Sequence, residues 1–319
     1  MRTLFAVLFV AVLSWLLGAW IVVKGNPEVR FWVAAYEARL LELRDERVGE
    51  DETVPHVLFT GGSSCAFSVD PEIIEERTGR PAYNLGGPAA AGMPFLVDLA
   101  LQEAKSGDVL VLALERHFLA EPDRVHPTRL GIACAVDMGR KDLVEGGDWV
   151  PYRLPPHRIA DEMRPGLRFL STLGGKMLLR RDPYRYEMDD LRARGRMETD
   201  YRDQWKRAVG QPPELSLSAE GREFLSAARD EAAGRGVTIC YSLPWLFTEE
   251  RWVDANRARH KELLNQVAAI VPVLEDRAFG VRSNPDDFSD SEYHLTAEGS
   301  RERSSRLAEG LLQFLDGNE

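Results

Sequence analysis

The feature that most constrains this chain is an apolar run near its N-terminus, from residue 4 to residue 23. Only Ser14 and Gly18 interrupt it, and as a helix it would be about 30 Å long, the thickness of a bilayer's hydrocarbon core. A cleaved signal peptide is the alternative, but its apolar core is usually about 7 to 15 residues long and ends at small residues. Because this run is longer and no such site follows, we predict an uncleaved transmembrane helix over residues 1–24.

The segment after this run predicts a second, amphipathic helix. Residues 25–50 carry apolar side chains near helical spacing, with Glu and Arg between them. Such a helix would be a stalk or packing helix between the anchor and the rest of the chain, or else a helix that binds a partner. Residues 49–53 (GEDET) form a polar break, which indicates a domain boundary before a main domain at residues 51–319.

The composition excludes several classes of protein. Hydrophobic residues make up 44% and charged residues 29% of the 319 positions, which rules out a mainly disordered chain. Only one stretch is apolar enough to span a bilayer, so a polytopic membrane protein is excluded as well. The net charge of −11 argues against a nucleic-acid binder, which needs a basic face.

Cysteine and histidine residues are too few and too scattered to suggest a disulfide scaffold or a metal site. The chain has three cysteines, Cys65, Cys134 and Cys240, and six histidines without metal-ligand spacing. A bond between Cys65 and Cys134 is the only pairing considered, and we predict three free thiols. No metal or organic cofactor is expected.

Short apolar runs alternate with helical patterns through the main domain. Strands are predicted at residues 56–60, 82–85, 109–114, 237–243 and 271–274, and helices at residues 71–76, 93–105, 218–235, 249–270 and 296–315. Alternation of this kind predicts an α/β fold, with a parallel sheet and helices on both faces. Ligands of such sheets bind outside the carboxyl ends of the strands.

One long segment, residues 121–213, does not share this alternation and is rich in Pro, Gly, Arg and Asp. We interpret it as an insertion that covers one edge of the sheet, with helices at residues 159–163 and 167–179. Its arginines between Arg180 and Arg196 are interleaved with acidic residues. Mixed charge of this kind favours a solvated face, and contact with an anionic substrate or headgroup is the alternative.

Two segments contain the residue types of nucleophilic catalysis. Ser63 follows the first strand and two glycines, which permit the tight turn that exposes a nucleophilic serine. His294 lies just before the last helix, four residues after Asp290, whose carboxylate is close enough to orient the ring. Taken singly, these segments also fit a serine-capped turn and a surface or core histidine.

A third segment, residues 83–92 (YNLGGPAAAG), follows the second strand. The amide of Asn84 and the backbone N–H groups of glycines such as Gly86 and Gly92 can donate hydrogen bonds to a developing oxyanion. A Gly-Pro turn that opens a helix explains the same residues equally well.

In their order, these segments resemble the SGNH/GDSL hydrolase superfamily, and most closely its membrane-anchored, extracytoplasmic members. The matching stretches cover a little over half of the chain and centre on residues 61–70, 84–86, 107–112 and 294–299. The resemblance implies a flavodoxin-like three-layer sandwich with a mainly parallel sheet. It also implies that Ser63 is the nucleophile, His294 the general base and Asp290 its orienting carboxylate. The Ser63 N–H and the loop from Gly86 to Gly92 would form the oxyanion hole.

The chain departs from this family pattern at several positions. Gly62 stands where the family has the aspartate of G-D-S, and no asparagine follows the third strand. Asn84 would then take over the missing amide role, or the oxyanion hole would be weak. Many members have the aspartate three residues before the histidine, where this chain has Ser291. Ser64 is an alternative nucleophile if the turn is shifted by one residue.

Relatives with one N-terminal anchor and such a domain occur in cell-envelope acylation systems. The resemblance therefore implies a membrane-anchored serine hydrolase or acyltransferase that acts on an acyl ester, acetyl above all, of an envelope polysaccharide or lipid. A membrane-bound O-acyltransferase is the candidate protein partner, and a catalytically weak scaffold of such a complex is the alternative function. The domain is expected on the extracytoplasmic side of the cytoplasmic membrane. Positive charge on both sides of the anchor leaves the orientation open.

Overall fold

The computed structural model describes residues 2–49, 54–121, 126–151, 153–164, 174–175, 186–199, 208–274 and 276–317. A parallel four-stranded sheet lies at its centre. The strands are β1 (Val57–Thr60), β2 (Ala82–Asn84), β3 (Val109–Leu112) and β4 (Thr238–Tyr241), in the order β2-β1-β3-β4. Neighbouring strands are parallel throughout. The predicted α/β class and its parallel strands are therefore confirmed.

The fifth predicted strand, residues 271–274, is reduced to one parallel bridge between Val273 and Tyr241 of β4. The chain instead forms a separate parallel pair from two short strands that the sequence did not predict. These strands are β5 (Leu246–Phe247) and β6 (Val281–Arg282). Two-residue strands carry too short an apolar run to be recognised from the sequence pattern.

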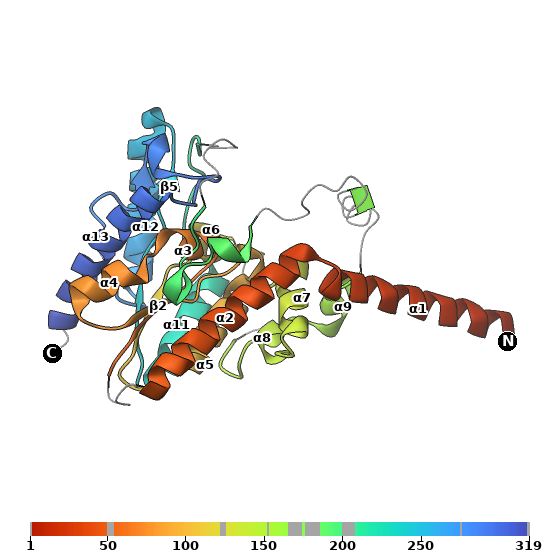
Figure 1. Cartoon of the computed structure of the whole chain (residues 1–319). Helices are drawn as coiled ribbons and strands as arrows, with labels where there is room; N and C mark the ends of the chain where they lie inside the picture. Colours follow the sequence, from red (N-terminus) through yellow and green to blue (C-terminus); the bar gives the residue numbers. More distant parts are fainter. Residues whose placement is uncertain are drawn as a thin grey trace.

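Side chains of the central strands alternate between two cores, one on each face of the sheet. On one face, Phe59, Val111 and Cys240 pack with residues of the helices α4 (Pro71–Thr78) and α13 (Ala297–Asp316). These two helices lie side by side (Figure 1).

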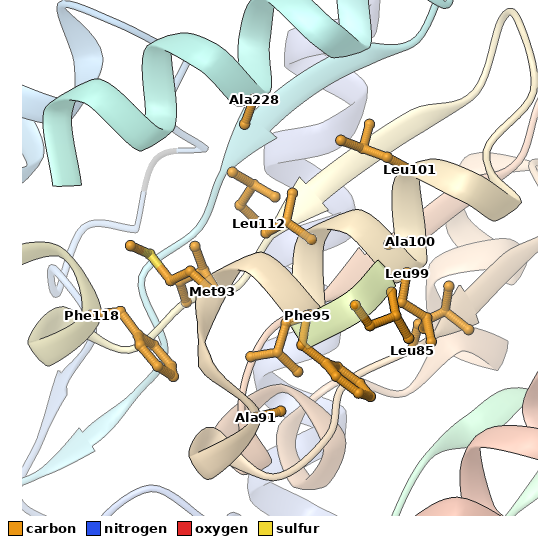
Figure 2. Close-up of a cluster of buried hydrophobic side chains, with 14 of the residues drawn as sticks. Leu85, Ala91, Met93, Phe95, Leu99, Ala100, Leu101, Leu112, Phe118 and Ala228 are labelled. Carbon is orange, nitrogen blue, oxygen red and sulfur yellow. The ribbon is translucent and has the colours of Figure 1, made fainter. Parts of the chain in front are cut away.

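The larger core lies on the other face of the sheet. It contains strand residues such as Leu58, together with residues of α5 (Gly92–Glu103), α11 (Ala219–Gly234) and α12 (Val253–Ala268). Figure 2 shows part of this core, with Phe95 of α5, Leu112 of β3 and Ala228 of α11. Helices therefore cover both faces of the sheet, as predicted.

Capping residues start three of these helices where the sequence predicts. Asp70 accepts a hydrogen bond from the Glu72 N–H, and Pro71 occupies the first position of α4. Ser218 caps α11 and Thr296 caps α13, each accepting from the N–H of the third residue that follows. Such caps satisfy backbone donors that the helix itself leaves unpaired.

Further short elements connect these helices and strands. The α-helices are α3 (Ser63–Ser68), α6 (Arg116–Ala120), α7 (Arg129–Asp137), α8 (Asp142–Glu145) and α9 (Pro156–Glu162). The 3₁₀ turns are η1 (Ala89–Ala91), η3 (Met188–Asp190), η4 (Ala193–Gly195), η5 (Glu250–Trp252) and η6 (Pro285–Asp287). The predicted helix at residues 159–163 overlaps α9, whereas the one at residues 167–179 lies, apart from residues 174–175, outside the described residues.

The segment after the apolar helix is packed on the body. It forms α2 (Pro27–Gly49), which runs along the domain in Figure 1. One face of α2 is buried in the larger core through Val29, Trp32, Tyr36, Leu40 and Leu43. The buried side chain of Arg39 donates to the carbonyl of Gly86, and Arg47 pairs with Asp108. Of the roles considered for this segment, α2 is thus a packing helix of the main domain.

The apolar run itself forms α1 (Arg2–Lys24), which projects away from the domain in Figure 1. Within the described part of the chain, it is the one helix long and apolar enough to cross a membrane. Residues 2–17 are exposed, but Val22 and Val23 are buried, and the last turns contact α7. Lys24 pairs with Asp137 at the end of α7. The apolar run therefore projects over most of its length, while its last turns belong to the packed domain.

This difference within α1 predicts two outcomes of truncation. Removal of residues 1–17 is expected to give soluble, folded protein, because these residues touch little of the domain. Removal of residues 1–24 also deletes Val22 and Val23 and uncovers α7, which we expect to cost about 2–5 kcal/mol of unfolding free energy. Urea unfolding and gel filtration of both chains would test this. Aggregation of the shorter deletion would show that residues 1–17 are part of the fold.

The insertion is fastened to the domain by residues 186–199, which we call the strap. Arg194 pairs with Glu46 of α2 and Glu75 of α4, and Arg196 pairs with Asp70. The strap lies against β2, the edge strand, because a Cβ at Gly195 would come within 2.1 Å of the Asn84 carbonyl oxygen.

These ion pairs change the interpretation of the arginines in the insertion. The mixed charge of this segment predicts a solvated face, with contact to an anionic substrate or headgroup as the alternative. Arg194 and Arg196 are instead partly buried and bind acidic side chains of the domain itself. Arg180, Arg181 and Arg185 lie outside the described residues.

Candidate active site

The candidate nucleophile lies at the start of a short helix that follows the first strand. The chain leaves β1 through Gly61 and Gly62, and α3 begins at Ser63. A Cβ at Gly61 would lie only 2.1 Å from the Ala113 carbonyl oxygen, so a glycine is required where the turn crosses the end of β3. The turn leaves Ser63 partly exposed at the carboxyl end of the sheet.

The candidate base lies in a tight loop before α13. The Ser289 N–H donates to the carbonyl of His294 at 2.8 Å, which closes the loop at its base. The Ser291 hydroxyl accepts from the N–H groups of Tyr293 and His294 at 3.2 and 3.0 Å. These bonds hold the short segment from Asp290 to His294 in one compact turn.

The three predicted catalytic side chains form a continuous hydrogen-bonded line. Nδ1 of His294 lies 2.7 Å from Oδ1 of Asp290, and Nε2 lies 2.9 Å from Oγ of Ser63. A carboxylate only accepts hydrogen bonds, so the ring donates from Nδ1 and Nε2 is free to accept the serine proton. Both distances lie within the range of about 2.6 to 3.2 Å that proton transfer requires.

The same geometry decides between the alternatives left open by the sequence. Ser64, one residue after Ser63, is fully buried, and its hydroxyl has no hydrogen-bond partner among the described residues. Asp290 contacts the ring of His294, whereas Ser291 bonds to backbone N–H groups. Ser63 and Asp290 are thus the members of the line, and Ser291 shapes the loop.

Two aromatic residues that sequence reasoning missed surround the histidine. The Tyr186 hydroxyl donates to Oδ2 of Asp290 at 2.7 Å and lies 3.2 Å from Nδ1 of His294. Phe67 of α3 stacks on the His294 ring, with centroids 4.3 Å apart and planes at 22°. Tyr186 lies between charged residues of the insertion, where no local pattern distinguishes it. Phe67 lies four residues after Ser63 in α3, so the two share one face of the helix. A prediction of this short helix from the sequence would have identified Phe67 as a neighbour of the site.

Replacement of Tyr186 by phenylalanine is expected to slow the reaction of Ser63 about tenfold. The variant keeps the ring but removes the hydrogen bond to Asp290, which is worth about 1.5 kcal/mol when the acceptor is charged. The rate of covalent modification of Ser63 by a fluorophosphonate would measure the effect. Phe314→Leu, a change in an aromatic residue of α13, serves as the control. An unchanged rate in Tyr186→Phe would remove this residue from the site.

The predicted oxyanion donors are wrong in three cases, because their polar groups are used within the fold. The Asn84 amide donates to the carbonyls of Cys65 and Val69, both at 2.9 Å, and its oxygen accepts from the Gly86 N–H at 2.9 Å. The Gly92 N–H bonds to the carbonyl of Ala89. Asn84, Gly86 and Gly92 therefore hold the loops together, and none of these groups remains to stabilise an oxyanion.

The nucleophile turn itself retains one donor. The N–H groups of Gly62 and Ser64 both bond to the carboxylate of Glu115, at 3.2 Å each. Between them, the N–H of Ser63 bonds to no acceptor within the described ranges. Unlike the donors of Asn84, Gly86 and Gly92, the predicted donor at the Ser63 N–H therefore stays available.

Arg116, the residue that follows Glu115, contacts a buried neutral histidine, His260. Arg116 contacts Nε2 of His260 at 3.2 Å, and Nδ1 of the same ring donates to the Phe279 carbonyl at 2.8 Å. Arginine only donates, so Nε2 must be the acceptor and the ring uncharged. Burial is the main cause that lowers the pKa of His260 to about 4; the hydrogen bond to the Phe279 carbonyl opposes this shift, and the charge of Arg116 adds to it.

This shift predicts a loss of stability in acid. Between about pH 6.5 and pH 4 the unfolded chain binds a proton at His260 that the folded chain does not, so the unfolding free energy falls with pH by up to roughly 3 kcal/mol. His260→Gln should lack this contribution. Thermal unfolding of both proteins from pH 7 to pH 4 would show the wild type losing its advantage. A constant difference across this range would contradict the assignment.

The three cysteines and the possible metal-ligating side chains are the further candidates for reactive groups. Cys65, Cys134 and Cys240 are free and buried, which confirms the prediction of three unbonded thiols. Burial raises the pKa of Cys65 to about 12, so this neighbour of Ser63 is not a competing nucleophile. Among the described residues, no group of three or more His, Cys, Asp or Glu side chains is arranged to hold a metal ion.

Comparison with known proteins adds no identification. No protein-family model and no curated protein sequence matches this chain. The chemistry of the site must therefore be argued from its own residues.

Proposed function

We propose that this chain is a membrane-anchored serine hydrolase or acyltransferase of the SGNH type. The observation that carries the proposal is the hydrogen-bonded line from Ser63 through His294 to Asp290, with distances of 2.9 and 2.7 Å. These residues lie 231 and 4 positions apart in the chain, so their convergence is a property of the fold and not of local sequence. A serine with such a partner is a nucleophile by geometry and role.

The topology of the sheet supports the proposal that the domain is a flavodoxin-like sandwich. Its strand order β2-β1-β3-β4, with the Val273 bridge beside β4, follows the flavodoxin-like order 2-1-3-4-5. In such sheets ligands bind where the strand order reverses, between β1 and β3. Ser63 follows β1 directly, so the proposed nucleophile lies at this position.

The proposed reaction forms and breaks one acyl bond in each of two steps. Oγ of Ser63 attacks the acyl carbon while its proton passes to Nε2 of His294, and the alkoxide of the ester leaves with that proton. The acyl-enzyme is then attacked by water or by a sugar hydroxyl, whose proton again passes through His294. Asp290 stabilises the charged ring, and the Ser63 N–H donates to the oxyanion.

The proposed substrate and location follow from α1 together with the family resemblance. A helix of 23 residues would tether the domain to the cytoplasmic membrane. We propose that the domain faces the extracytoplasmic side and that its substrate is an acyl ester, acetyl above all, of an envelope polysaccharide or lipid. A membrane-bound O-acyltransferase would be the protein partner that supplies or receives the acyl group.

A fluorophosphonate probe tests the proposed nucleophile directly. In the full chain in detergent, Oγ of Ser63 is expected to displace fluoride from phosphorus and to leave a phosphonylated peptide detectable by mass spectrometry. Ser63→Ala should abolish this adduct, while Ser64→Ala, a neighbouring buried serine, should retain it. An adduct that persists in Ser63→Ala, or one absent from the wild type, would refute the catalytic proposal.

One observation favours the alternative function, a catalytically weak scaffold of an acyltransferase complex. Asn84, Gly86 and Gly92 use their donors within the fold, so three of the predicted oxyanion donors are lost. Loss of a single oxyanion donor typically costs about 10²- to 10³-fold in kcat. A scaffold would keep α1 and α2 for assembly and would show little or no labelling of Ser63.

A further inference from the structure

The side chain beneath the nucleophile turn is that of Glu115, which follows β3 and precedes α6. Glu115 is 1% exposed, and each of its carboxylate oxygens accepts one backbone N–H. Oε2 accepts from Gly62 and Oε1 from Ser64, both at 3.2 Å. The two bonded residues are the immediate neighbours of Ser63, so this one carboxylate holds the turn on both sides of the nucleophile.

Gly62 is the residue that makes room for this carboxylate. A Cβ at position 62 would lie 2.2 and 2.5 Å from the two oxygens of Glu115, closer than any non-bonded contact allows. Gly62 and Glu115 are therefore a matched pair. The pair explains why glycine stands here in place of the family's aspartate, since any side chain at this position would expel Glu115.

The physical environment suits a buried carboxylate. Backbone N–H groups at the start of a helix lack partners within the helix and carry partial positive charge, both of which favour an anion there. The fully buried guanidinium of Arg303 also interacts electrostatically with Glu115. These contacts offset the cost of burying a charge, and they tie the flexible Gly62 to a fixed point behind β3.

We propose that Glu115 is a positioning residue that sets the direction of Ser63 toward His294. This inference rests on the proposed function for its kinetic consequence, but the bonds to Gly62 and Ser64 do not depend on it. Glu115 acts through the backbone and not on the substrate. A nucleophile displaced by about 1 Å can lose about 10²-fold in rate, so release of the turn should reduce the rate of reaction and not the binding of a reagent.

The proposal is tested in the full chain in detergent with Glu115→Ala, Gly62→Ala and the double variant. Surface controls are Glu223→Ala and Gly234→Ala, because Glu223 is exposed and a Cβ at Gly234 meets nothing within 4 Å. Each test variant is expected to lower the maximal rate of fluorophosphonate labelling about 10- to 100-fold, with the half-saturating concentration unchanged. The double variant should be no slower than Glu115→Ala, because the added methyl then fills vacated space. Glu115→Gln, which keeps one acceptor oxygen, should be intermediate.

A second measurement separates this proposal from the proposed function. Hydrogen exchange of the Gly62 and Ser64 amides, followed by mass spectrometry on the peptide that contains them, should be slow in the wild type and faster in Glu115→Ala. If the wild type is not labelled but exchange responds in this way, the catalytic proposal fails and the positioning role stands. The inference would be overturned if amide exchange were unchanged in Glu115→Ala. It would also be overturned if the rate losses of the two single variants multiplied in the double variant, or if Glu115→Ala lowered the melting temperature but left the labelling rate unchanged.

Discussion

Replacement of His294 by alanine is expected to lower the rate of fluorophosphonate labelling at Ser63 by about 10⁴-fold. The hydroxyl of Ser63 is a weak nucleophile until a base removes its proton, and Nε2 of His294 lies 2.9 Å from that hydroxyl. The measurement is the second-order rate constant for labelling of folded protein by the fluorophosphonate. The variant should remain folded, because His294 lies on a loop and belongs to no helix or strand of the domain.

Two further variants make this expectation specific. His157→Ala, a replacement of an exposed histidine on α9, should label at the wild-type rate. Asp290→Asn should be slow by itself, because an amide facing Nδ1 can favour the wrong tautomer of the ring, and it should add little to His294→Ala. If His294→Ala labels as fast as the wild type, Ser63 is activated by another group and the proposed line is not a catalytic unit.

Replacement of Leu43 by alanine is expected to lower the unfolding free energy by about 2–5 kcal/mol. Leu43 is fully buried in the larger core, although it belongs to α2, which precedes the predicted domain boundary at residues 49–53. Removal of its side chain leaves a cavity that the surrounding strands and helices fill only in part. Urea unfolding of the chain without residues 1–17 would measure the loss.

The same helix offers a matched control. Leu41, two residues earlier, is 59% exposed, so Leu41→Ala should change the unfolding free energy by less than about 0.5 kcal/mol. The two variants remove the same atoms from the same helix and differ only in what those atoms contact. Equal unfolding curves for both would mean that α2 stands away from the body as a stalk, and that the domain begins after residue 53.

Much of the scaffold could be predicted because its determinants are local. The strands β1 and β3 are almost entirely apolar and fully buried, which is typical of strands covered by helices on both faces of a sheet. Asp70, Ser218 and Thr296 start helices through bonds to N–H groups two or three residues away, which the local sequence contains in full. The order of these elements along the chain predicts the parallel sheet.

The residues of the proposed catalytic line could be named from sequence for a related reason. Ser63 and His294 each lie directly beyond an element that the sequence predicts, at a strand end and before a capped helix. The carboxyl ends of parallel strands meet at one edge of the sheet, so residues there converge whatever the length of chain between them. The choice of Ser63 over Ser64 still needed the structure, because these adjacent side chains at the start of α3 differ in exposure: Ser63 is partly exposed and Ser64 is fully buried.

The residues around the catalytic line depended on the tertiary structure alone. Tyr186 reaches Asp290 across 104 positions and Glu115 reaches Gly62 across 53, and no local pattern records either distance. The role of Asn84 could not be predicted from local sequence either. An amide that follows a strand can donate to an oxyanion or to backbone carbonyls, and the sequence pattern is the same in both cases. In the folded chain the carbonyls of Cys65 and Val69 lie beside the Asn84 amide. A buried amide needs hydrogen-bond partners, and these carbonyls provide them. Local sequence patterns were thus enough to predict the four central strands, the starts of three helices and the three catalytic candidates. Tertiary packing, which joins residues far apart in the chain, set which polar groups bond within the fold and which stay available.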